Sequence, residues 1–134
     1  MYKYLWKRCL DEEVIKKAWK KLRKGKTERD DVIRIDGNLD YYVKKMQEQL
    51  RNTRPGEVEY PELAFCPPPH IPHTVFEHGK ERTIFCPSIW EQWVHHIIVQ
   101  VLGPIIIKHS YKYSCGSMPK RGSHYGKRKM ERII

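Results

Sequence analysis

The sequence lacks the features of membrane-spanning and secreted proteins. Its longest apolar stretch is interrupted by His95, His96 and Gln100, so it never reaches the roughly 18 apolar residues that span a bilayer. The basic N-terminus has neither an apolar core nor a small-residue cleavage site, unlike a signal peptide. We therefore expect a soluble, cytoplasmic protein of about one domain, with no membrane partner.

Paired cysteines are also missing. The chain has four scattered cysteines and no C-x-x-C motif: Cys9, Cys66, Cys86 and Cys115. In an intracellular chain this pattern predicts free thiols rather than a disulfide framework. No G-x-S-x-G motif is present, and nothing in the sequence ties a particular cysteine to a particular histidine, so a hydrolytic or acyl-transfer enzyme has little support.

One group of cysteines and histidines leaves a small zinc-binding protein open as an alternative. Cys66-x-x-x-His70-x-x-His73, with His78 and Cys86 nearby, offers zinc-type ligands. The spacing matches no standard zinc finger or ribbon, and prolines stiffen the chain between the ligands. We expect no metal at these residues.

Acidic residues are scarce at both ends of the chain. Net charge is +10, with ten Lys or Arg against three acids in residues 1–26 and eight against one in residues 108–134. The segment 27–63 between them is mixed, with nine acids and six bases. Two basic ends favour contact with a polyanion, because each phosphate neutralised by Lys or Arg releases counterions. A merely solubilising surface is the alternative.

Two amphipathic helices are expected before residue 52. The first has acids at its start, can end at Gly25, and carries one apolar stripe: Val14, Ile15, Ala18, Trp19 and Leu22. The second runs from about residue 38 to 51, with Asn38 as N-cap and a further stripe: Leu39, Tyr42, Val43, Met46 and Leu50. Asp30 and Asp31 are placed in a charged linker between these helices.

Residues 53–73 form a proline-rich connection in which regular structure is not expected. Phe65 gives this connection a side chain with which to pack on the protein. Short β-prone runs at residues 74–76 and 82–85 then predict a β-hairpin with Gly79 in its turn.

A strong core helix is expected after the hairpin. Ser88 and Glu91 have the form of a capping box, and Gly103-Pro104 is the predicted end of the helix. A polar loop follows, and a last basic helix begins at Ser123 as its cap and finishes on residues 133–134. The predicted fold is α+β and mainly helical, with helices packed around a short antiparallel hairpin. We treat residues 1–134 as one region with three parts: 1–52, 53–73 and 74–134.

Three blocks of sequence, in this order, carry a family resemblance. They are Lys80-Glu-Arg-Thr-Ile-Phe-Cys-Pro87, a helix with the tail Val-Leu-Gly-Pro-Ile, and Ser-Cys-Gly-Ser-Met-Pro-Lys-Arg-Gly-Ser-His-Tyr-Gly. Over residues 80–128 this order resembles the fingers region of prokaryotic reverse transcriptases of the group II intron, diversity-generating and phage types. Before residue 80 the resemblance is loose. It implies an RNA-directed DNA polymerase whose partners are an RNA or RNA/DNA template-primer and a deoxynucleoside triphosphate.

The resemblance assigns roles to two sets of basic residues. Arg82, helped by Lys80, would contact the triphosphate of the incoming nucleotide; side chains two apart on a strand share a face, and Arg offers a rigid fork for phosphate oxygens. Without the resemblance, the simpler interpretation is that Lys80 and Arg82 are solvated charges on the surface of the hairpin. The second set would lie along the template strand: Gly116, Lys120, Arg121, Gly122, Lys127 and Arg128. Tyr111, Tyr113 and Tyr125 could stack on bases there, although tyrosines more often serve packing.

This sequence departs from the family at two places. It has Glu91-Gln92 where the family has Asp-Arg, and Ser117-Met118 where the family often has Phe-Arg. It also lacks the metal-binding aspartates and the Y-x-D-D turn of the palm, and Glu131 is the one carboxylate side chain after Glu91. Two-metal phosphoryl transfer needs such carboxylates. We therefore expect no catalytic residue here, no cofactor bound by this chain, Mg²⁺ only with the missing palm, and no polymerase activity from the chain alone. A stand-alone RNA-binding or regulatory protein remains the alternative.

Overall fold

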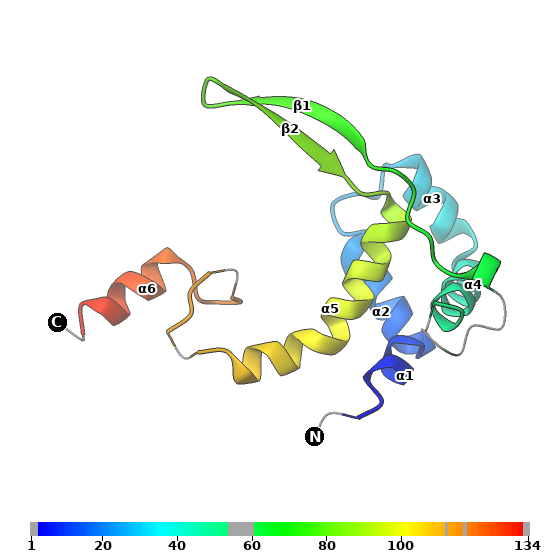
Figure 1. The fold of residues 1–134 in the computed structure, drawn as a ribbon, viewed down its shortest axis with the longest axis horizontal. Helices are drawn as coiled ribbons and strands as arrows, with labels where there is room; N and C mark the ends of the chain where they lie inside the picture. Colours follow the sequence, from blue (N-terminus) through cyan, green and yellow to red (C-terminus); the bar gives the residue numbers. More distant parts are fainter. Residues whose placement is uncertain (1–2, 54–60, 112, 117, 133–134) are drawn as a thin grey trace. The chain divides into compact units, whose positions relative to one another are not determined.

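The fold was examined in a computed structural model that describes residues 3–53, 61–111, 113–116 and 118–132. The chain divides into two compact units, Met1–Val101 and Leu102–Ile134. It is mainly helical with one two-stranded antiparallel sheet, which confirms the α+β class (Figure 1). Within the described residues, no helix combines the length and apolar character needed to cross a membrane.

Over its described residues, the first unit contains four short helices, a 3₁₀ turn and the hairpin. They are α1 (Leu5–Cys9), α2 (Glu12–Leu22), α3 (Asp30–Gly37), α4 (Leu39–Arg51), η1 (Pro61–Leu63), β1 (Ile71–Glu77) and β2 (Lys80–Cys86). Helix α5 (Ile89–His109) starts in the first unit and continues past its boundary, and α6 (Ser123–Met130) belongs to the second unit. The sequence analysis did not predict α1 or α3. Asp30 and Asp31 form the first turn of α3 rather than a linker, where acids complement the helix dipole.

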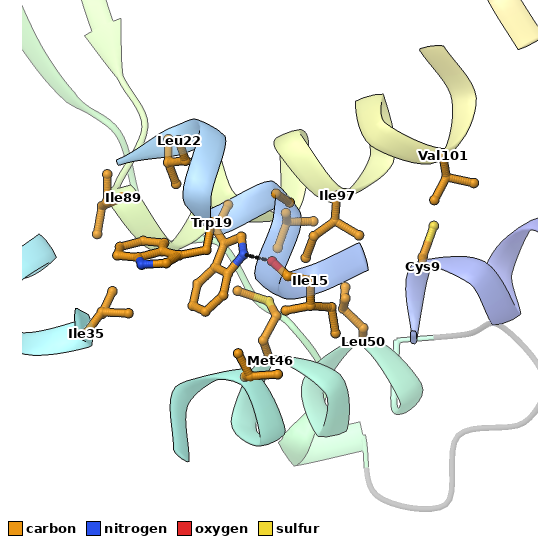
Figure 2. Packing of buried hydrophobic residues seen from close by; sticks show 14 of the residues in the cluster. Cys9, Ile15, Trp19, Leu22, Ile35, Met46, Leu50, Ile89, Ile97 and Val101 are labelled. Carbon is orange, nitrogen blue, oxygen red and sulfur yellow. Dashed lines mark hydrogen bonds between the residues drawn. The ribbon is translucent and has the colours of Figure 1, made fainter. Parts of the chain in front are cut away.

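The core of the first unit lies between α2, α4 and the first half of α5, as Figure 2 shows. The predicted α2 stripe is confirmed: Ile15, Ala18, Trp19 and Leu22 are buried. Trp19 packs on Trp93 of α5 with ring centroids 4.7 Å apart, and the Trp93 indole N–H donates to the Ile15 carbonyl at 2.9 Å. The helices are therefore joined by both apolar contact and a hydrogen bond.

The ends of the N-terminal helices match the sequence in part. Asp11 caps α2 by accepting from the backbone N–H of Glu13 at 2.9 Å, and Gly25 follows the helix with a φ of 76°. Helix α4 spans the predicted residues, with its predicted stripe turned to the core. Asn38 precedes it, but its side chain makes no capping hydrogen bond, so the predicted Asn cap is wrong in its chemistry.

The proline-rich connection packs through Phe65, as expected. Phe65 contacts the core cluster, and its backbone N–H donates to the Thr53 hydroxyl at 2.9 Å. Residues 54–60 of this connection lie outside the described residues. The hairpin that follows is longer than predicted, because β1 begins at Ile71 and carries Pro72 opposite Phe85.

Helix α5 does not end at Gly103-Pro104 as predicted but runs to His109 with Pro104 inside it. Proline disfavours a helical residue before it through a clash with that residue's Cβ, and Gly103 has no Cβ. The fixed φ of Pro104 is itself helical, so one backbone donor is lost without ending the helix.

The last helix also begins differently from the prediction. Gly122 occupies the N-cap position of α6 and Ser123 is the first helical residue, with no side-chain cap. The helix ends at Met130, so Arg132 follows it rather than lying within it. The predicted apolar end at residues 133–134 lies outside the described residues.

Candidate nucleic-acid interface

The β-hairpin presents Lys80 and Arg82 on one face. His78 and Gly79 form its two-residue turn with φ values of 52° and 74°, the backbone expected of a tight hairpin turn. The register pairs Glu77 with Lys80 and Val75 with Arg82. All fourteen strand residues are exposed, so the hairpin projects from the helical core (Figure 1). The predicted pair of cations is thus brought together and is accessible to solvent.

Glu77 is a further residue of this face that the sequence analysis did not select. Its carboxylate lies 3.1 Å from the Arg82 guanidinium, with both side chains more than half exposed. Ion pairs this exposed contribute little, on the order of 0.2–1 kcal/mol, so Arg82 can exchange Glu77 for a phosphate. The two-residue turn could have identified Glu77, because it fixes Glu77 directly across from Lys80.

The hairpin is attached to the core at the first turn of α5. The Glu91 carboxylate, almost fully buried, lies 2.8 Å from Nε2 of His70, the residue before β1. The Gln92 amide donates to the carbonyl of Pro87, the residue after β2, at 2.8 Å. Adjacent side chains of α5 therefore fix the two strand ends.

This arrangement corrects the predicted capping box. The Glu91 backbone N–H donates to the Ser88 hydroxyl at 3.2 Å, which is the half of the motif that the structure contains. The Glu91 side chain pairs with His70 instead of reaching back to the backbone of Ser88, because the imidazole offers a buried carboxylate a polar partner. The same position is where this sequence departs from the reverse transcriptase pattern.

The glycine-rich loop contains a tight turn over Met118–Arg121. The Arg121 N–H donates to the Met118 carbonyl at 3.1 Å, and Lys120 has a φ of 62°. Pro119 followed by a positive φ fits a type II turn, in which the third position usually holds Gly or Asn. Lys120 therefore occupies a strained position, and its ammonium side chain is exposed.

The two predicted glycines of the loop are not required by packing. A Cβ added at Gly116 or Gly122 would meet no atom within 4 Å, and neither residue has a positive φ. Both leave open space beside the backbone, with Gly122 at the start of α6. This space leaves room for a ligand to approach the backbone closely.

Helix α6 separates two residues that the sequence analysis grouped together. Arg128 is three residues after Tyr125 and Lys129 four after it, so the three share a face. Lys127 lies on another face, 4.0 Å from Glu131. No residue of α6 is buried. The face carrying Tyr125 and Arg128 is therefore basic, with Arg128 exposed and Tyr125 half-buried, whereas the charge of Lys127 is partly offset.

A second basic surface occurs in the first unit, where the sequence indicated charge but no particular residues. A shallow hollow is lined mainly by α2, with one residue of α1 and two of α5: Arg8, Glu13, Val14, Lys16, Lys17, Lys20, Gln100 and Val101. Lys16 lies 2.8 Å from Glu12 and 2.9 Å from Asp40. The hydrogen bonds that Lys16 donates, first to Glu12 and then to Asp40, raise its pKa above the ordinary value. The charge of Lys16 is thus paired with two carboxylates.

The alternative zinc ligands are not gathered into a site. In the described part of the chain, no three His, Cys, Asp or Glu side chains lie close enough to hold a metal ion. His70 is instead paired with Glu91, and Cys66 and Cys86 are exposed free thiols. Cys9, a further free thiol, is buried, and burial raises its pKa.

Comparison with known proteins adds no family. The chain matches no protein-family model, and no curated protein matches it.

Proposed function

We propose that this chain binds nucleic acid through the basic surfaces of the hairpin and of α6 with its preceding loop, as the fingers portion of an RNA-directed DNA polymerase. The polymerase assignment depends on the resemblance over residues 80–128. The observation that carries nucleic-acid binding is the solvent-accessible hollow on one face of α6, which combines Arg128, Lys129 and Tyr125 with no acid. A polar helix with no buried side chain gains little from packing within its own chain, so a polyanion is a suitable partner for it.

The hairpin would bind the triphosphate of a nucleotide. Arg82 and Lys80 share a face, and Arg presents donors in a planar fork that matches phosphate oxygens. Glu77 would compete with the phosphate for Arg82, so nucleotide binding involves the exchange of one exposed anion for another.

Salt-dependent RNA binding tests the first part of the proposal. We expect log K to fall linearly with log salt, and Arg128→Ala/Arg132→Ala to reduce the slope by roughly 0.7 per cation on a single strand and 0.9 on a duplex. Lys44→Ala/Lys45→Ala removes the same charge from exposed positions of α4 and is the matched control. Gel-shift titrations measure both slopes. Lack of salt-sensitive binding by the unaltered chain would exclude the proposal, and equal loss in the control would remove α6 as the interface.

Two substitutions with opposite expected effects test the nucleotide contact. Arg82→Ala should weaken binding of a deoxynucleoside triphosphate by about ten-fold, near the lower end for hydrogen bonds to charged groups. Glu77→Gln should strengthen it, because the competing anion is removed. Equilibrium dialysis with labelled nucleotide measures both. If RNA binds but the nucleotide does not, the stand-alone RNA-binding protein becomes the better description.

A further inference from the structure

Tyr125 lies at the centre of the basic face of α6. The Arg121 guanidinium is 5.8 Å and the Lys129 ammonium 5.6 Å from the centroid of its ring. A hollow of about 250 Å³ opens beside it, lined by Tyr125, Arg128, Lys129 and Arg132. An aromatic ring therefore forms part of the wall of a hollow that is otherwise lined by cations.

The acid of this segment is directed elsewhere. Glu131 pairs with Lys127, which lies about 200° around the helix from Tyr125. Gly126, about 100° around, lies against the preceding segment, since a Cβ there would come within 3.1 Å of the Cys115 sulfur. Helix α6 thus lies against the Cys115 segment on its Gly126 side, whereas its Tyr125 side meets the cationic side chain of Arg121 and keeps its positive charge.

The chemistry of this face selects one class of ligand. Cations alone would serve any phosphate backbone, but a ring among them can also stack on a flat base. A base within a duplex is already paired and stacked, so its face is not available to Tyr125. An unpaired base can stack on the Tyr125 ring while the phosphates on either side of it bind the flanking arginines.

We propose that the Tyr125 face of α6 is a site for single-stranded nucleic acid, with one unpaired base stacked on Tyr125 and adjacent phosphates bound by Arg128 and Arg132. This inference rests on the proposed function and adds the form of nucleic acid and the stacking residue. Stacking on an aromatic side chain changes affinity by about 5- to 150-fold per base, against about 2- to 5-fold for an exposed cation–π contact. The base therefore displaces the flexible Lys129 side chain from the ring.

Substitutions that remove the ring without changing charge provide the test. We expect Tyr125→Leu to weaken binding of a single-stranded oligonucleotide at least five-fold, and Tyr125→Phe to retain the affinity of the unaltered chain. The salt slope should stay the same in both, since no cation is lost. Binding of a duplex of equal length should not change. Tyr41→Leu, which removes an exposed tyrosine of α4, is the matched control.

Fluorescence anisotropy with labelled single-stranded and duplex oligonucleotides measures all of these affinities, and circular dichroism checks the helix content of each variant. The proposal is overturned if Tyr125→Leu binds the single strand as the unaltered chain does, if it weakens the duplex equally, or if Tyr125→Phe is as weak as Tyr125→Leu. Each of these outcomes leaves nucleic-acid binding itself in place. If the unaltered chain binds neither oligonucleotide, the proposed function itself is wrong.

Discussion

Helices α2 and α6 are both rich in lysine and arginine, but they relate to their surroundings in opposite ways. Four side chains of α2 are buried, and Trp19 among them packs on Trp93 and donates to Asp36 at 2.7 Å. No side chain of α6 is buried, and its aromatic residue, Tyr125, is surrounded by cations. The first helix uses its aromatic residue for the stability of the fold. The second leaves its aromatic residue on the surface, where it can act on a ligand.

The hairpin stands between these extremes. Phe76 and Phe85 are 76% and 61% exposed on the face opposite Lys80 and Arg82, so the strands gain little from burial. A two-stranded hairpin is marginal in water by itself, and its contacts with α5 must therefore support it. The order from α2 through the hairpin to α6 is one of decreasing dependence on the chain's own core, and each region can be tested for it.

The largest effect is expected from Trp93→Ala. Its side chain is fully buried, packs on Trp19 and donates to Ile15, so its loss should cost about 3–5 kcal/mol, much of a typical domain's stability. Tyr125→Ala should change stability by less than about 0.5 kcal/mol. Urea unfolding followed by far-ultraviolet circular dichroism measures this, since the signal reports the helices of both units. Equal effects of the two substitutions would contradict the contrast between core and α6.

A smaller effect is expected from Glu91→Ala, which leaves His70 without its partner. The His70 side chain is 39% exposed, so water can replace Glu91 there, and the lost hydrogen bond should cost about 0.5–1.5 kcal/mol. We expect hydrogen exchange to accelerate in β1 and β2 while α2 and α4 remain protected. Gln92→Ala, which removes the contact to Pro87, is a second variant that loosens the other strand. If hydrogen exchange accelerates equally throughout the first unit, Glu91 instead stabilises the whole core.

Much of the helical core was predictable from the sequence, because burying one face of a helix places apolar residues at a regular spacing along the chain. The stripes at residues 14–22 and 39–50 point to the core as predicted, and the hairpin forms around the predicted Gly79. Helix α3 was not predicted, because its eight residues have only two buried side chains, Val32 and Ile35, too few to show a period.

The candidate sites were less predictable, because they depend on which side chains come together. The position of Lys80 and Arg82 on one face follows from strand alternation alone. The pairing of Glu91 with His70 joins residues 21 positions apart through the fold, and no local pattern encodes it. The split between Arg128 and Lys127 follows from helix geometry, but the strain at Lys120 arises from a turn that Pro119 signals only in part.

A small effect on stability, and the sharpest separation of fold from function, is expected at Lys120. A non-glycine residue with φ near 60° destabilises the folded chain by about 1–2 kcal/mol, and Lys120→Gly removes this strain. Glycine is also freer in the unfolded chain, which offsets about 0.5–1 kcal/mol of that gain in stability. Stability should therefore stay level or rise by up to about 1.5 kcal/mol, whereas the salt slope of RNA binding should fall by about 0.7–0.9. Thermal unfolding followed by far-ultraviolet circular dichroism and RNA titrations over a salt series measure the two. Lys120→Asn, which tolerates the same backbone without the charge, should match Lys120→Gly in slope. If the slope is unchanged in both variants, the strained lysine does not contact phosphate; if it falls, the strain is maintained for the sake of the charge.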